Sequence, residues 1–234
     1  MLEFLTKILP NLMANKRYVN FGISIVQTLQ MTLWSGAISF VLGLAFGIIL
    51  VVTKKGAILE NKIVYQILDK LINFFRSIPF IILLTGVMPL SRLIMGTSID
   101  VRGAIVPLVF GTVPFFSRQI ETALAEVDSG LVEAAVSMGL SPWDIVLRVY
   151  LKESIGPIVR GTMITTVSLI GLTAMAGAVG AGGLGNFAIQ YGHDMNMQDI
   201  TWLTIILLVI VVNLIQWAGT NFIKKHTIKL FAKG

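Results

Sequence analysis

The segment from Glu133 to Leu151 places charged side chains between two long apolar stretches. Its charged residues, with the lysine that follows, are Glu133, Asp144, Arg148 and Lys152. Such groups are costly to expose to lipid, so the segment is predicted to lie at the membrane surface. Carboxylates there can make charge-assisted contacts, and the segment is therefore predicted to present a face to another molecule.

The first half of this segment is predicted to form a short helix that ends at a glycine. A side-chain oxygen of Asp128 or Ser129 can cap the start of the helix. Glu133 then falls near the first turns, where the helix dipole favours a negative charge. Gly139 suits the left-handed position past the helix end, after which the chain can start a second helix at once.

The second half carries a helix-start pattern of its own. Ser141, Pro142 and Asp144 form an S-x-x-D capping box with proline at the first helical position. A hairpin of two short helices is therefore predicted over residues 129–152. An ordinary interfacial hairpin with good caps would show the same pattern, and that interpretation stays open at this point.

The same residues resemble the EAA loop of ATP-binding-cassette (ABC) importer permeases. That pattern is Glu-Ala-Ala, three residues, glycine, nine residues, and Ile-x-Leu-Pro. The matching residues here are Glu133, Ala134, Ala135, Gly139, Val149 and Leu151. Val149 replaces the isoleucine, and Lys152 replaces the usual proline, which removes a helix-start signal before the next apolar stretch.

The resemblance implies that the hairpin is a coupling helix that sits in a cleft of a separate ATPase subunit. Small side chains such as those of Ala134 and Ala135 suit this role, because they let a partner's surface approach closely. The residues that the resemblance assigns to ATPase coupling are Glu133, Ala134, Ala135, Gly139, Ser141 and Asp144.

The composition predicts a polytopic membrane protein. Of the 234 residues, 55% are hydrophobic and 13% are charged, which is too apolar for a soluble domain. The absence of cysteine excludes disulfides and thiolate metal sites, and His193 and His226 are too far apart for a histidine metal cluster. The net charge of +6 does not point to nucleic acid, because the basic residues cluster at the ends of apolar runs.

Five apolar stretches are long enough to cross a bilayer, so the predicted fold is all-α with five transmembrane helices and a cytoplasmic hairpin. The stretches cover approximately residues 25–52, 71–95, 103–125, 155–178 and 200–222. Ser39, Gly43 and Gly47 should line one face of the first and permit close helix contact. Pro79 should kink or break the second. The polar end of the third should project into the cytoplasm or pack inside the bundle.

A single transmembrane permease domain is predicted over residues 21–224. Residues 1–20 have apolar side chains at helical spacing and are predicted to form an amphipathic helix in the membrane interface, bent near Pro10. This segment lacks the order of a signal peptide. Residues 225–234 are predicted to form a basic cytoplasmic tail.

The distribution of basic residues predicts the orientation of the chain. Those of the link around Lys54, of the hairpin and of the C-terminal tail all fall on one side, which is predicted to be the cytoplasm. Five spans then place the N-terminus outside, where Lys7, Lys16 and Arg17 run against the rule. Together with the family resemblance, this predicts a multi-pass protein of a bacterial inner membrane.

A glycine run after the fourth stretch matches a nucleotide-binding pattern but lacks its setting. Gly180, Gly182 and Gly185 fit G-x-G-x-x-G, with Asp199 following. The motif requires a preceding strand in a soluble α/β unit, whereas transmembrane stretches flank this run. A small-residue outer loop or re-entrant turn is predicted instead. No G-x-x-x-x-G-K-[ST] is present, so no cofactor is predicted in this chain, and ATP and Mg are expected on a partner ATPase.

Further segments resemble the methionine-importer branch of these permeases. They are FRSIPFIILL from Phe75, GTSI from Gly96, AIVPL from Ala104, and AMAGAVGAGGLG with QYG between Ala174 and Gly192. The resemblance implies a homodimer in membrane lipid, a dimeric ATPase and an external substrate-binding lipoprotein. It implies that the chain is not itself an enzyme and works by alternating access, driven by ATP hydrolysis in the partner.

Hydroxyl groups and a methionine in the fourth stretch are candidates for the translocation path. Methionine is a zwitterion with an apolar thioether, which suits a path with few fixed charges and some hydroxyls. The candidates are Thr162, Met163, Thr165, Thr166 and Ser168. Threonine hydroxyls in membrane helices often simply bond to the preceding turn, and this alternative stays open for each of them.

Other functions are also compatible with parts of the sequence. A permease for a different amino acid or small solute is the nearest alternative, because the external binding protein largely sets specificity. A secondary transporter should show internal repeats and ionisable residues near mid-membrane, and neither is evident. A channel or membrane scaffold gives no reason for a capped hairpin.

Overall fold

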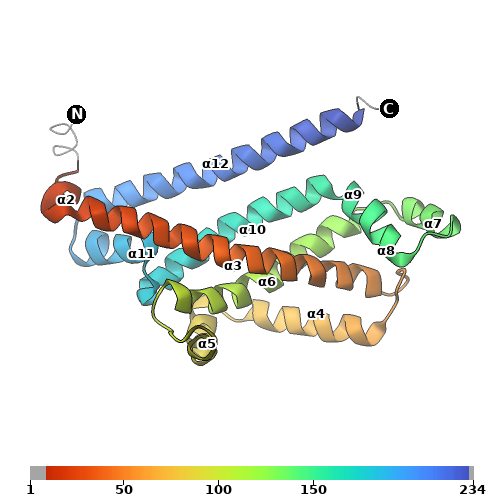
Figure 1. The fold of residues 1–234 in the computed structure, drawn as a ribbon, viewed down its shortest axis with the longest axis horizontal. Helices are drawn as coiled ribbons and strands as arrows, with labels where there is room; N and C mark the ends of the chain where they lie inside the picture. The colour runs from red at the N-terminus through yellow and green to blue at the C-terminus, as the bar shows by residue number, and fades with distance from the viewer. Residues whose placement is uncertain (1–8, 232–234) are drawn as a thin grey trace. The chain divides into compact units, whose positions relative to one another are not determined.

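The computed structural model describes residues 9–231, with the side chains of all of these except 15 and 226–231. The part of the chain that it describes is helical and contains no strand. Four helices are long and apolar enough to cross a membrane: α3 (Arg17–Thr53), α6 (Val101–Ala125), α10 (Ile155–Ala176) and α12 (Gln198–Phe231) (Figure 1). The predicted all-α membrane fold is confirmed.

The predicted second span is a pair of helices. α4 (Lys62–Ser77) and α5 (Phe80–Met95) are separated by Ile78 and Pro79, which both have extended ψ angles, 124° and 133°. Proline lacks the N–H that a continuous helix needs and disfavours helical backbone in the residue before it. The chain therefore breaks at Pro79. Counted as one broken span, the pair completes the predicted five.

The first long helix starts earlier than expected, at Arg17 instead of near Ile25. Its 37 residues extend about 56 Å, more than the hydrocarbon thickness of about 30 Å. Before it lie α2 (Pro10–Met13) and a 3₁₀ turn (Ala14–Lys16), so Pro10 begins a short helix. Residues 1–8 of the predicted interfacial helix lie outside the described residues, and its membrane placement stays a prediction.

The chain forms two compact units, and α3, α6, α10 and α12 each contribute to both. Unit 1 contains the chain up to residue 37, residues 79–110 and residues 166–214. Its main core brings together one apolar side chain or more from each of these segments. The buried members are Met31, Leu84, Ala104, Leu108, Leu169, Ala176 and Ala181.

The glycine run folds as a tight turn within unit 1. It comprises a π turn (Gly177–Ala181), α11 (Gly183–Phe187) and a second π turn (Ala188–Asp194). Gly180 and Gly182 have φ angles of 97° and 83°, and a Cβ on Gly185 would lie 2.2 Å from the carbonyl oxygen of Ala174. The predicted close packing of this turn is confirmed. Its position outside the membrane remains a prediction.

The segment before α3 is held within unit 1 by hydrogen bonds and apolar packing. The backbone N and the Nδ2 of Asn11 donate to the two carboxylate oxygens of Asp199, at 3.0 and 2.8 Å. Leu12 is buried with Phe187 and Ile200 in a second small core. This segment therefore packs against protein at the start of α12.

Unit 2 contains residues 38–78, residues 111–165 and the chain from 215 onwards. In it, α3 approaches α6 so closely that a Cβ on Gly43 would lie 2.7 Å from Phe116 and one on Gly47 would lie 2.5 Å from Ile120. This confirms the predicted close contact along the Ser39–Gly47 face. The side chains of Phe116 and Ile120 are both buried, so the second half of α6 packs inside the protein.

An ion cluster joins α4 to this half of α6. The guanidinium of Arg118 pairs with the carboxylates of Asp69 and Glu121 and donates to Oδ1 of Asn73 at 2.9 Å. The side chains of Arg118 and Asp69 are 19% and 29% exposed. The cluster helps to accommodate a polar helix end within a membrane protein, since one guanidinium is shared by two carboxylates.

Candidate functional site

The first helix of the predicted hairpin is α7 (Ser129–Ser137). It begins at Asp128, whose carboxylate accepts a hydrogen bond of 2.7 Å from the N–H of Gly130. It ends at Gly139, which has a φ of +77°. Leu140 N donates to Ala135 O, and Gly139 N donates to Val136 O, which together form a Schellman motif. The predicted start and the left-handed glycine are both confirmed.

The second helix begins at the predicted cap and then continues without a stop. Ser141 Oγ accepts from the N–H of Asp144 at 3.2 Å and donates to its carboxylate at 2.6 Å. The carboxylate thus returns to the serine hydroxyl instead of the backbone N–H of an ordinary capping box. α8 (Pro142–Ile145) is followed by a π turn (Val146–Tyr150) and α9 (Leu151–Glu153). α10 starts directly after Ser154.

The inner face of the hairpin is anchored in the core of unit 2. Ala135, Ile145, Val146 and Tyr150 are buried in one cluster with residues from the ends of α3 and α6. Figure 1 shows α7 and α8 beyond the end of α6, near the link between α3 and α4. Ala135, with 2% of its surface exposed, is therefore a packing residue in this structure, while Ala134 is exposed.

The hairpin exposes several large apolar side chains, which sequence inspection did not single out. Met138 and Trp143 are 72% and 74% exposed on the two helices. We call these two residues, together with Leu131, Val136 and Leu147, the docking face. Exposed large apolar side chains on a short, charged hairpin indicate a protein contact. The signal was available, because all of these residues except Leu147 lie between Asp128 and Asp144, which belong to the predicted helix caps.

Two of the remaining predicted coupling residues are acidic, Glu133 and Asp144. Glu133 is the fifth residue of α7 and exposed, and its carboxylate makes no hydrogen bond or ion pair with any described residue. Asp144 makes an ion pair of 3.1 Å with Arg148 one turn later. Glu133 is thus left available to something other than its own helix start.

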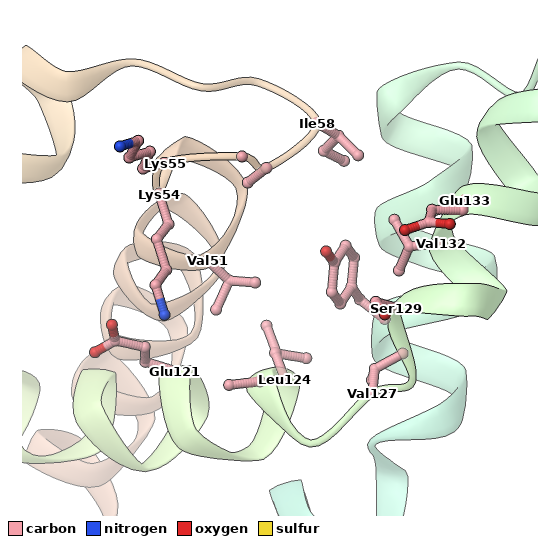
Figure 2. Close-up of a pocket in the computed structure, with 14 residues that line it drawn as sticks. Val51, Lys54, Lys55, Ile58, Glu121, Leu124, Val127, Ser129, Val132 and Glu133 are labelled. Atoms are coloured by element: carbon pink, nitrogen blue, oxygen red, sulfur yellow. The ribbon is translucent and has the colours of Figure 1, made fainter.

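A cavity of about 310 Å³ lies on the inner side of α7, against the α3–α4 link. Figure 2 shows Lys54 and Glu121 on one side of it and Glu133 on the other, with Val51 and Leu124 between them. The Tyr150 side chain also lines this cavity, and burial raises the pKa of its hydroxyl. The phenol therefore stays neutral at physiological pH and can donate a hydrogen bond.

Three of the five candidates for the translocation path bond or pack within the protein. Thr162 and Thr165 donate to the carbonyls of Ile158 and Gly161 in the preceding turn, at 2.9 and 2.8 Å. A Cβ on Gly219 of α12 would lie 1.9 Å from Sδ of Met163, so this methionine packs on that glycine. The set is also divided, because Thr162, Met163 and Thr165 belong to unit 2, whereas Thr166 and Ser168 belong to unit 1.

Comparison with known proteins identifies the family. The family model for the inner-membrane component of binding-protein-dependent transport systems matches residues 43–223. The chain belongs to this family. The matched range includes the hairpin, all of α6 and α10, and parts of α3 and α12.

Several similar proteins have names that specify a substrate. The permease is 46% identical over 204 residues to a probable D-methionine transport system permease protein MetI of Pasteurella multocida, covering 87% of this chain and 94% of that protein. It is 41% identical over 181 residues to the methionine import system permease protein MetP of Bacillus subtilis, covering 76% and 82% of the two chains.

The fold agrees with a solved relative. A chain of the MetNI methionine ABC transporter in an inward-facing conformation superposes with a TM-score of 0.88 at 43% identity, covering 91% of the permease and 99% of that chain. An amino acid ABC transporter with histidines superposes with a TM-score of 0.73 at 16% identity, which shows a shared fold.

Proposed function

We propose that the permease is the membrane-spanning subunit of an ATP-driven ABC importer and forms the translocation path for methionine. The observation that carries this proposal is the similarity over nearly the whole length to permeases named for methionine transport. The alternative is a permease for a different amino acid or small solute, and the test below must distinguish it from a methionine permease.

The proposed assembly contains two copies of the permease, a separate dimeric ATPase that binds ATP and Mg, and an external substrate-binding lipoprotein. The sequence supports a separate ATPase, because it contains no P-loop. Large apolar side chains exposed on α3 and α12 provide surface for lipid and for a second copy; Trp34 and Trp202 are each 63% exposed. The hairpin and the C-terminus lie in the cytoplasm in this proposal, and the N-terminus lies outside.

Coupling is proposed to run through the docking face. Met138 and Trp143 would enter a cleft of the ATPase, as aromatic and methionine side chains commonly do at the centre of protein interfaces. Ala134 allows close approach beside them, and Glu133 contributes a charged contact at the edge. The buried inner face then carries the movement into α3 and α6, because Ala135 and Ile145 are packed in the same core as those helices.

The transport cycle follows from this connection. ATP binding closes the two ATPase subunits, draws the paired hairpins together and opens the permease outward to receive substrate. Hydrolysis and product release return it to an inward-facing state. Along the path, Thr162, Met163, Thr165, Thr166 and Ser168 supply hydroxyls and a thioether without fixed charge.

The proposal is tested with the purified complex in proteoliposomes. ATP-dependent uptake of labelled methionine should be competed by unlabelled methionine and much less by other amino acids at equal concentration. Trp143→Ala should weaken ATPase binding by about 30-fold, the effect of a typical interface anchor. Leu59→Ala is the matched control, because Leu59 is 49% exposed on the neighbouring α3–α4 link but outside the docking face. Equal uptake of an unrelated solute would refute the methionine assignment.

A further inference from the structure

The cavity behind the hairpin has the features of a small-molecule site. Its volume of about 310 Å³ is at the lower end of the range for ligand pockets, about 300–1,000 Å³. All of its walls belong to unit 2: the end of α3 and the following link, the end of α6, the start of α7, and Tyr150. Charged groups stand at its edges over an apolar floor.

The charges at the edges are available to a ligand. Neither Lys54 nor Glu133 forms an ion pair or side-chain hydrogen bond with any residue that the structure describes. Figure 2 shows the ammonium of Lys54 between Val51 and Glu121 and the carboxylate of Glu133 on the opposite side of the cavity, while the ammonium of Lys55 points away. One cationic and one anionic group thus face a common space from different elements.

The signs of these charges restrict the charge that a ligand of this cavity can carry. Glu121 is already paired with Arg118, so Lys54 and Glu133 are the two charged groups facing the cavity without a partner among the described residues. An anion alone would leave Glu133 unmatched, and a cation alone would leave Lys54 unmatched. A molecule that carries both an ammonium and an anionic group can match both of them. Its apolar part would lie against Val51 and Leu124, and the neutral Tyr150 hydroxyl can donate to its anionic group.

We propose that this cavity binds a small zwitterion, with its anionic group at Lys54 and its ammonium at Glu133. A free amino acid and the head group of an ethanolamine phospholipid share this chemistry. The site is distinct from the candidate path on α10, because no residue of that set lines it.

Binding of a ligand at this site would change the stiffness of the hairpin. Glu133 and the neighbouring Val132 both line the cavity and belong to α7, the helix that carries Met138 at its end. A bound zwitterion would tie α7 to the α3–α4 link and stiffen the hairpin. This consequence for coupling rests on the proposed function, whereas the binding itself does not.

The experiment measures binding to the purified permease–ATPase complex in nanodiscs, without ATP. Calorimetric titration compares L-methionine with 4-(methylthio)butanoate, which lacks the ammonium, and with 3-(methylthio)propylamine, which lacks the carboxylate. Native mass spectrometry compares the retention of phosphatidylethanolamine with that of phosphatidylglycerol. Both measurements are repeated on three variants: Lys54→Ala removes the cation, Ala57→Trp fills the cavity from the link, and Lys62→Ala is a charge-matched control outside the cavity.

We expect Lys54→Ala and Ala57→Trp to weaken binding of one zwitterion source by about tenfold or more, and Lys62→Ala to leave it unchanged. Loss of methionine binding identifies a free amino acid, and loss of phosphatidylethanolamine identifies the lipid. Equal binding by wild type and both cavity variants would overturn the proposal, as would equal affinity for 4-(methylthio)butanoate and methionine together with equal retention of phosphatidylglycerol and phosphatidylethanolamine. Failure of methionine uptake with a preserved difference between wild type and Lys54→Ala would refute the transport assignment alone.

Discussion

The hydroxyl of Ser154 donates a buried hydrogen bond of 3.0 Å to the carbonyl oxygen of Ala123, across 31 residues of chain. One partner precedes the hairpin at the end of α6, and the other follows it immediately before α10. The bond therefore closes the base of the hairpin and fixes where its two ends leave the transmembrane helices. Only 1% of Ser154 is exposed, so no water can replace the bond easily.

Removing this hydroxyl should loosen the base of the hairpin. Ser154→Ala leaves the carbonyl of Ala123 without this donor and should cost about 1 kcal/mol of stability. We expect a lower unfolding temperature of the purified permease in detergent. Ser137→Ala, which changes an exposed serine of α7, should leave that temperature unchanged. Equal unfolding temperatures for the two variants would show that the bond contributes nothing.

The ion cluster on α6 should matter much more than the ion pair on the hairpin. Arg118→Gln leaves the carboxylates of Asp69 and Glu121 together without their cation, which should cost about 1–3 kcal/mol in this mostly buried setting. Arg148→Gln removes a pair whose arginine is 73% exposed, so it should have little effect. Thermal unfolding of both variants checks the order. Adding Asp69→Asn to Arg118→Gln should recover part of the loss, and no recovery would argue against direct coupling.

The orientation of the chain can be tested with single cysteines, because the natural sequence has none. Cysteines at Ser141 and Lys229 should stay unlabelled by a membrane-impermeant reagent in intact cells, and both should react after permeabilisation. A cysteine at Ile99, which is 65% exposed in the link between α5 and α6, should react in intact cells. The reverse pattern would invert the predicted topology.

The isolated permease should neither bind ATP tightly nor hydrolyse it, because its sequence has no P-loop. Phosphate release is measured for the permease alone, for the complex and for a preparation of the ATPase alone. Activity that rises in proportion to the concentration of rigorously purified permease would contradict a separate ATPase.

Local sequence signals predicted the hairpin well, because its conformation is set by nearby groups. Asp128 and Ser141 cap helices through bonds to the next two or three residues, and Gly139 meets a backbone requirement at its own position. The same holds for Gly43 and Gly47, where the absence of a side chain signals close packing. Such features need no knowledge of distant residues.

Features that depend on distant residues were missed. Nothing near Arg118 in sequence reveals its pairing with Asp69 on another helix, and nothing near Lys54 reveals a cavity shared with Glu133. The break at Pro79 was predicted only as a kink or break, because proline's effect depends on what packs around it. Similarly, Ala134 and Ala135 look equivalent in sequence, and only the packing of α7 makes one exposed and the other buried.

The central claim is that the hairpin transmits ATPase movement to the membrane helices, and substitutions at Gly139 and Glu133 test it most directly. Valine at φ +77° costs about 1–2 kcal/mol locally and misdirects the second helix, whereas asparagine tolerates this conformation and serves as the matched control. Glu133→Lys reverses a free, exposed charge without disturbing the backbone.

The decisive measurement is ATP hydrolysis stimulated by binding protein and substrate, recorded together with methionine uptake in the same proteoliposomes. Gly139→Val and Glu133→Lys should insert and dimerise normally, hold the ATPase more weakly, and lose hydrolysis and uptake in parallel, while Gly139→Asn stays near wild type. If both variants instead bind the ATPase and transport at wild-type rates, the hairpin is only a connector and the claim of coupling is wrong.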